Sequence, residues 1–104
     1  MKKSFFAVLL VLAIILVGCS GPDTEGKTYR IIYNANGAEG FPPVDNRLYA
    51  SGEVAVVMDK NTLRKDGYEF QNWNTKKEGD GIAYNVGAAI TVKNINIFLY
   101  AIWK

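Results

Sequence analysis

The fold of this chain is decided by one stretch, Leu63-Arg64-Lys65-Asp66-Gly67-Tyr68-Glu69-Phe70-Gln71-Asn72-Trp73-Asn74-Thr75. Within it, Tyr68 and Phe70 alternate with polar residues, and this period of two predicts a strand with one buried face and one wet face. The pairs Asp66-Gly67 before the strand and Asn74-Thr75 after it are typical of turns. We therefore predict an aromatic strand that closes a small β core.

The alternation fails once inside this strand, because strict alternation would bury Asn72 and expose Trp73. A β-bulge at Asn72 adds one residue and returns the large indole to the inner face. Asparagine is among the few non-glycine residues that tolerate the left-handed backbone found in some bulges. We therefore predict a bulge at Asn72 and a buried Trp73.

Further strands are predicted on both sides of this stretch by alternating or β-branched apolar residues. They cover residues 29–33, 54–58, 82–84 and 95–103, with a short edge piece at 48–49 and an ambiguous segment at 88–92. Asn36-Gly37 is a strong turn pair, and residues 59–65 could hold a single helical turn. Both faces of residues 95–103 are apolar, which predicts a central strand. The expected fold is mostly β, α+β at most, with little or no helix.

The first residues have the pattern of an export signal. Met1-Lys2-Lys3 is basic, and residues 5–17 form an uncharged apolar run that is shorter than the roughly 20 residues of a membrane-spanning helix. We interpret residues 1–18 as a secretory signal peptide. The following Leu16-Val17-Gly18-Cys19 resembles the lipobox of bacterial lipoproteins, and this resemblance implies cleavage before Cys19 and lipid on its sulfur. The alternative is an ordinary thiol in an uncleaved anchor helix.

Cys19 is the single cysteine, so an intramolecular disulfide is excluded. Lipidation explains an unpaired cysteine in an exported chain, and several acyl chains (palmitate and diacylglycerol) on one residue anchor a protein stably. We expect a membrane-anchored, extracytoplasmic lipoprotein of the cell envelope, at the cell surface or on the periplasmic face. Residues 19–27 then form the lipidated cysteine and a flexible tether that spans at most about 25–30 Å.

Charge excludes one class of partner. Lys2 and Lys3 account for the whole formal net charge of +2, so the chain after the signal peptide carries equal numbers of acidic and basic side chains. These charges are mixed along the chain and make no basic stripe of the kind that nucleic-acid binding needs. We expect no nucleic-acid partner.

Residues 28–104 carry several spaced motifs that together resemble the Listeria–Bacteroides repeat, the B-repeat type found in internalin B. They are Tyr33-Asn34-Ala35-Asn36-Gly37, the stretch at residues 63–75, Gly79-Asp80-Gly81, and Leu99-Tyr100-Ala101-Ile102-Trp103. Two residues depart from the pattern, since Ala38 and Asn72 stand where members carry glycine. The structural motif residues in this single copy are Tyr33, Asn36, Gly37, Gly67, Tyr68, Phe70, Asn72, Trp73, Tyr84, Tyr100 and Trp103.

The resemblance implies a small β-grasp-like domain, similar to ubiquitin or SUMO, with a single sheet in which the first and last strands are adjacent. The residue patterns by themselves support a sheet with a central C-terminal strand. They leave a small β-sandwich open as an alternative.

The residues offer little for catalysis. The chain has no histidine, and its one thiol is assigned to lipid, so the usual bases, nucleophiles and zinc ligands are missing. A glycosidase pair drawn from Glu39, Asp45 and Glu53 has no sequence feature to select it. Glu78-Gly79-Asp80-Gly81 lacks the spacing of an EF-hand, which favours a plain hairpin loop over a calcium site. We predict that the protein is not an enzyme and has neither a cofactor nor a metal.

Aromatic and amide side chains suggest a binding surface, although none is singled out as ligand-binding. Trp73, Trp103, Tyr84 and Tyr100 could form a sugar- or peptide-binding platform, but strand spacing in so small a domain favours a core role. The amides of Asn34, Asn36, Gln71, Asn72 and Asn74 could line a glycan-binding face, although such residues are more often found in turns and bulges.

Three functions are compatible with these sequence features. The first is a lipid-anchored binding or adhesion-type module that engages a protein or glycan through loops or a sheet edge. The alternative is a structural or accessory subunit of an envelope assembly. An exposed apolar patch outside the motif favours the first. An envelope enzyme, the third, would require carboxylates that converge in a real pocket.

Overall fold

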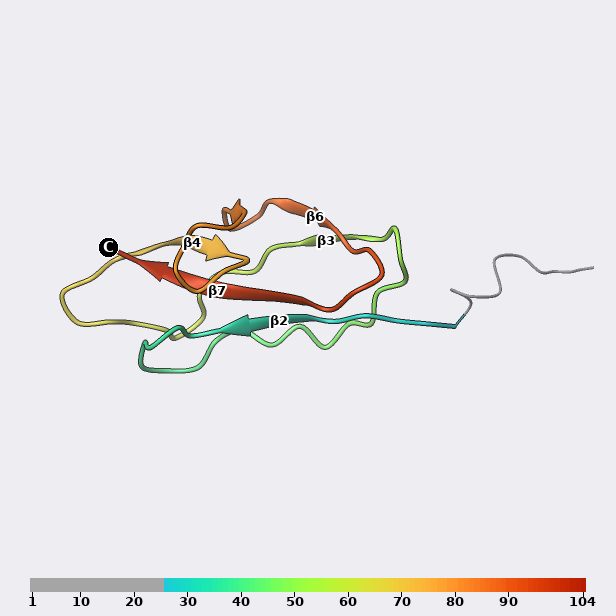
Figure 1. The fold of residues 1–104 in the computed structure, drawn as a ribbon. Coiled ribbons are helices and arrows are strands. Elements are labelled where there is room, and N and C mark those ends of the chain that lie inside the picture. The colour runs from blue at the N-terminus through green and yellow to red at the C-terminus, as the bar shows by residue number, and fades with distance from the viewer. Residues whose placement is uncertain (1–25) are drawn as a thin grey trace, which may run out of the picture.

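The computed structural model describes residues 26–104, and all structural statements refer to this part of the chain. It contains six strands, namely β2 (Ile31–Asn34), β3 (Val54–Val56), β4 (Phe70–Asn74), β5 (Ala83–Tyr84), β6 (Ala89–Thr91) and β7 (Ile97–Trp103) (Figure 1). No helix occurs among these residues, which confirms the mostly β prediction. The expected signal peptide, Cys19 and residues 19–25 lie outside the described residues.

β7 is the central strand of a four-stranded sheet with the order β2-β7-β4-β5. β2 runs parallel to β7, with Ile31 opposite Ile97, and β4 runs antiparallel on the other side. The first and last described strands are therefore adjacent, as predicted. The apolar residues on both faces of β7 correctly predicted its central position.

β3 and β6 form a separate, antiparallel two-stranded ribbon, in which Ala55 lies opposite Ile90. The prediction of a single sheet is therefore incomplete. The ribbon packs one face against the sheet, and this buries Ala55, Val57, Ile90 and Val92. If the ribbon were added to the edge of the sheet, these four apolar side chains would stay exposed to water. Because the ribbon packs face-on against the sheet, they are removed from water.

The bulge in β4 is present, but its extra residue is not the predicted one. Phe70 lies opposite Trp103 and Asn72 lies opposite Ile102, so Gln71 is the residue without a partner. Asn72 does not use the left-handed backbone that some bulges need, since the described non-glycine residues with positive φ are Asn36 and Asn61. Gln71 can be the unpaired residue of the bulge because its side chain is exposed, so no polar group is buried without a partner. Trp73 is fully buried, as predicted.

Two local predictions are wrong for the same reason, because a turn replaces the expected regular structure. Tyr68 does not share the buried face with Phe70 but is 52% exposed. Its N–H closes a turn onto the Lys65 carbonyl at 2.9 Å, and β4 begins at Phe70. Residues 59–65 form no helical turn, since the chain reverses at Asn61 with a φ of 58°.

The core lies between the sheet and the ribbon, and its centre is Trp73. The indole contacts Tyr33 and Phe70 edge to face, with ring centroids 4.8 and 5.3 Å apart. Trp73 Nε1 donates to the Met58 carbonyl at 2.9 Å, and Met58 N–H donates to the Tyr33 hydroxyl at 3.0 Å. Two buried aromatics thus satisfy both backbone groups of Met58 and hold the segment after β3 against the sheet. Burial raises the pKa of Tyr33 above its ordinary value.

Candidate functional site

The motif aromatics do not form one surface. Trp73 is enclosed in the core, Tyr84 lies opposite it on β5, and Trp103 is half-buried at the end of β7. Tyr100 alternates with the buried Leu99 and Ala101, so it points to the opposite face of the sheet. The hypothesis of a four-aromatic platform is therefore wrong, and the core interpretation holds for Trp73.

The asparagines hold a loop in place. Asn36 and Gly37 form the predicted turn, with φ values of 53° and 86°. The Asn36 Nδ2 also donates to the carbonyls of Lys77 and Ala101 at 2.8 and 2.9 Å. This amide therefore joins the first turn to β7 and to the glycine-rich loop (residues 76–81), a role that the turn signal did not reveal.

Asn74 is the buried polar residue that organises the glycine-rich loop. Its Oδ1 accepts hydrogen bonds from the N–H groups of Lys76 and Gly81 at 3.0 and 2.9 Å. Its Nδ2 donates to the Gly79 carbonyl at 3.2 Å. All three bonds lie within the loop, so the glycan-face hypothesis is not supported for Asn74. The sequence signal for this role is an asparagine at the end of a strand, directly before a glycine-rich segment.

The carboxylates considered as a glycosidase pair each make a separate local contact. Glu39 pairs with Arg64 at 2.9 Å, Asp45 accepts from the Tyr49 hydroxyl at 2.6 Å, and Glu53 accepts from the Ala50 N–H at 2.8 Å. Within residues 26–104, no three acidic side chains converge into an arrangement that could hold a metal ion.

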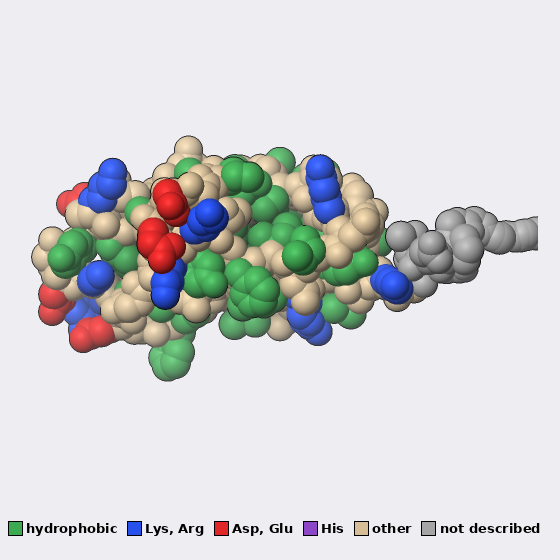
Figure 2. Space-filling model, in the orientation of Figure 1, with side chains coloured by type: hydrophobic (Ala, Val, Ile, Leu, Met, Phe, Trp, Pro, Cys, Tyr) green, Lys and Arg blue, Asp and Glu red, His purple; other side chains and the backbone are tan. Residues whose placement is uncertain are grey.

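A surface groove lies at one end of the domain, which we call the tip. It has a volume of about 380 Å³, and its walls come from residues 63–70 and the end of β7, with Lys60 beside them. Figure 2 shows acidic and basic side chains interspersed on this end of the visible face. The residues that line the groove are Lys60, Leu63, Arg64, Lys65, Asp66, Tyr68, Glu69, Phe70 and Trp103.

The tip is rigid because the sheet continues into it. Glu69 and Lys104 exchange two backbone hydrogen bonds of 2.7 and 3.0 Å, which extend the pairing of β4 with β7. Phe70 contacts Trp103 edge to face at 5.7 Å, and the Trp103 Nε1 donates to the Ala35 carbonyl at 3.2 Å. These contacts fix the walls of the groove without closing it.

An aromatic ring and three cations stand at the rim of the tip groove. The exposed Tyr68 ring lies under the Lys65 ammonium, with 4.6 Å from Nζ to the ring centroid. Arg64 is oriented by Asp66 and by Glu39 from another loop, each at 2.9 Å. Such exposed ion pairs add little to stability, but they hold the guanidinium at the surface. Lys60 donates to the Leu63 carbonyl at 3.2 Å.

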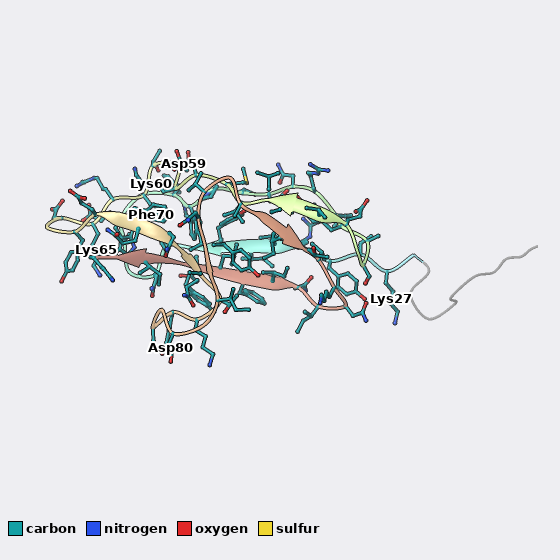
Figure 3. All side chains as sticks on the ribbon, turned by 90° about the horizontal axis from the view of Figure 1, so that it is seen from above. Lys27, Asp59, Lys60, Lys65, Phe70 and Asp80 are labelled. Atoms are coloured by element: carbon teal, nitrogen blue, oxygen red, sulfur yellow. The ribbon has the colours of Figure 1, made fainter. Side chains whose placement is uncertain are left out.

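The tip lies opposite the end where the described chain begins. β7 starts at Ile97, beside Ile31 of the first strand, and ends at Trp103, beside Phe70. Figure 3 accordingly places Lys65 and Phe70 toward one end of the domain and Lys27 at the other. A partner bound at the tip would therefore sit away from the segment that precedes residue 26.

The sheet edge at β2 is less open than the tip. Tyr29 and Tyr49 exchange two backbone hydrogen bonds of 2.8 and 2.9 Å. Pro42 and Pro43 line the same edge beside a groove of about 180 Å³. Prolines lack N–H donors and are a common device that blocks strand addition, so β-augmentation at this edge is disfavoured.

Comparison with known proteins decides the family. The family model of the Listeria-Bacteroides repeat domain matches residues 29–102. The chain belongs to this family. The resemblance noted in the sequence is thus confirmed at the level of the Listeria-Bacteroides repeat domain.

Two relatives come from Evansella cellulosilytica. A "Putative Gly-rich membrane protein" is 34% identical over 77 residues, which cover 73% of this chain and 9% of that protein. A "Putative membrane protein" is 30% identical over 77 residues, which cover 74% of this chain and 12% of that protein. The chain therefore spans about a tenth of the length of these relatives. No solved structure matches the chain significantly.

Among residues 26–104, the structure has no helix that is long and apolar enough to cross a membrane.

Proposed function

We propose that this protein is a membrane-anchored, extracytoplasmic binding module that holds a protein partner at its tip and has no catalytic activity of its own. The observation that carries the proposal is the tip groove, where the exposed Tyr68 ring lies under the half-buried Lys65 on a rigid end of the sheet. Tyrosine and arginine are enriched in protein interfaces, where they provide large contact area and directed hydrogen bonds.

The position of the tip supports this assignment. The chain enters the domain at the opposite end, and the lipobox-like residues before Cys19 favour anchorage there. A domain anchored at its base presents its far end to other molecules. The relatives named as membrane proteins are consistent with such a location.

The rigidity of the tip is also what a binding site needs. The turn of residues 65–68 is closed by a hydrogen bond, and the walls are held by the pairing of Glu69 with Lys104. A partner that binds this surface orders few additional side chains, which reduces the entropic cost of association. The separate local partners of Glu39, Asp45 and Glu53 support the assignment to a binding protein rather than to a hydrolase.

Photo-crosslinking in intact cells tests the proposal. A photoreactive phenylalanine analogue replaces Tyr68 in the full-length chain, and the matched control places the same analogue at Val56, which is exposed on the ribbon. We expect one discrete crosslinked protein from position 68 and none from position 56. Combining the analogue at 68 with Lys65→Glu should reduce the yield at least threefold.

The products distinguish the alternatives. A crosslinked species that resists protease but is degraded by glycan hydrolases would replace the protein partner with a glycan. Crosslinks from position 56 and none from position 68 would contradict the proposal and favour an accessory subunit that packs through its ribbon.

A further inference from the structure

We propose that the end of the domain opposite the tip rests on the surface of the membrane. We call this end the base and define it as residues 27–30, the turn at 50–53 and the loop at 93–96. In the proposed contact, Ile95 and Phe98 touch lipid while Lys27, Arg30 and Lys93 lie beside anionic headgroups. This inference rests on the membrane anchorage in the proposed function and adds the orientation of the domain and its second point of attachment.

Hydrogen bonds bring the three segments of the base together. The Arg30 N–H donates to Asn96 Oδ1 at 2.8 Å, and the Ile97 N–H donates to the Arg30 carbonyl at 2.9 Å. The Gly52 N–H donates to the Val92 carbonyl at 2.6 Å. The loop at 93–96 is therefore fixed beside the first residues of the described chain.

Exposed apolar side chains lie in the base and next to it, near the start of β7 and just before β5. Ile95 is 68% exposed, Phe98 is 50% exposed and Ile82 is 60% exposed. Two adjoining shallow grooves of about 350 and 340 Å³ share Ile95, Ile97 and Thr75 in their walls. The first groove is also lined by Ile82, and the second is also lined by Phe98. Aliphatic and aromatic side chains grouped in this way lose contact with water when they enter the boundary between headgroups and acyl chains.

The charges of the base suit an anionic surface. Lys27, Arg30 and Lys93 are exposed there, and Glu53 is turned back to accept a hydrogen bond from the Ala50 N–H. On the face shown in Figure 2, acidic side chains gather toward the tip, while the charged side chains near the base are lysine and arginine. Each cation near an anionic membrane surface strengthens attachment, and the attraction acts within a Debye length.

The length of the preceding chain selects lipid as the occupant of this surface. Six residues separate Cys19 from Gly26, and the seven steps between them span at most about 25 Å in an extended chain. An anchor at Cys19, or in the apolar run at residues 5–17, therefore keeps the base as the nearest part of the domain to the bilayer. A large soluble partner has little room to enter between them.

The test measures lipid contact on the full-length, acylated protein. The protein is reconstituted in vesicles of phosphatidylethanolamine and phosphatidylglycerol in a ratio of about three to one. An environment-sensitive dye is attached to Asn94→Cys beside Ile95, or to Asp66→Cys at the tip as the matched control. Protein without an added cysteine is treated with the same dye, and its fluorescence measures any labelling at Cys19. Lipids with a spin label in the acyl chain serve as the quencher.

We expect the spin-labelled lipid to quench the dye at position 94 at least twofold and to leave the dye at position 66 unchanged. Adding Lys93→Glu and Ile95→Asp should remove this quenching, whereas Val56→Asp on the ribbon should leave it intact. Raising the salt concentration from 0.1 to 1 M should weaken the quenching, because the Debye length falls from about 10 to about 3 Å.

The outcomes separate this inference from the proposed function. Protein that floats with the vesicles while both dyes remain equally unquenched would overturn the orientation and leave the anchorage intact. Protein that fails to float with vesicles would overturn the anchorage and the inference together. The crosslinks from Tyr68 are measured independently of both results.

Discussion

Replacement of Trp73 by phenylalanine tests whether this indole is the centre of the core. The side chain is fully buried, it contacts Tyr33 and Phe70 edge to face, and its N–H donates to the Met58 carbonyl. Phenylalanine keeps one ring in the site but leaves a cavity and removes the donor of the partly buried Met58 carbonyl. We therefore expect a larger effect than the change in hydrophobicity alone would produce.

The magnitude follows from these contacts. A buried carbonyl without its donor costs about 1–3 kcal/mol, and the lost ring volume adds about 1 kcal/mol. Trp73→Phe should therefore lower the free energy of unfolding by about 2–4 kcal/mol. Trp73→Ala should lower it by about 3–5 kcal/mol, a large part of the roughly 4–12 kcal/mol expected for a domain of this size.

Thermal and urea unfolding of the full-length protein in mild detergent, followed by circular dichroism, gives the values. Trp73→Phe should lower the melting temperature by about 10–30 °C. The matched control is Trp103→Phe, since Trp103 is half-buried and makes a longer hydrogen bond of 3.2 Å to the Ala35 carbonyl. A loss below 1 kcal/mol for Trp73→Phe, or one no larger than that of the control, would refute the reasoning.

Three further predictions concern single residues. Gly40→Ala should destabilise the domain by about 2–3 kcal/mol in urea unfolding, because φ is 94° and the new methyl group would meet the Thr62 carbonyl. Asn74→Ala should cost about 2–4 kcal/mol through its three lost hydrogen bonds and should speed tryptic cleavage in the glycine-rich loop about tenfold. Burial and the hydrogen bond to Asp45 raise the pKa of Tyr49 from 10.0 to about 12, so its stabilisation is complete below pH 10 and is lost as the pH rises through 12. Tyr49→Phe should lack this loss when unfolding is measured from pH 9 to 12.

Each of these predictions has a result that contradicts it. Gly37→Ala is the control for Gly40, since φ is also positive but the added carbon has free space. Equal losses for the two variants would mean that the contact with Thr62 is unimportant. Cleavage at the wild-type rate in Asn74→Ala would show that other contacts hold the loop. A parallel alkaline decline of wild type and Tyr49→Phe would remove Tyr49 as its cause.

Much of the fold could be predicted from local sequence, because its signals involve neighbouring residues. The failure of alternation at Asn72 indicated a strand with an extra residue, and burial of Trp73 followed from the size of the indole. The pairs Asn36-Gly37 and Asp66-Gly67 indicated turns because their backbone needs positive φ, which the structure shows at Asn36, Gly37 and Gly67. These features depend on periodicity and backbone geometry within a few residues.

The candidate site was less predictable, because the same aromatic motif serves two purposes. Trp73 and Tyr68 belong to one short motif, yet the first is enclosed and the second stands at the rim of the tip groove. The turn at Gly67 separates them, and its effect on Tyr68 depends on where β4 begins to pair with β7. No local pattern contains that information.

The sequence by itself therefore determined the class of fold, the central last strand, the turns and the buried indole. The tertiary structure alone decided that Gln71 is the unpaired residue of the bulge, that β3 and β6 form a separate ribbon, and that Phe98 is left exposed. The physical reason is sequence separation. The register of the strands, the layering of sheet and ribbon, and the exposure of each face are set by contacts between segments such as β4 and β7. These segments lie more than twenty residues apart, so local sequence allows several arrangements and only the long-range contacts select one.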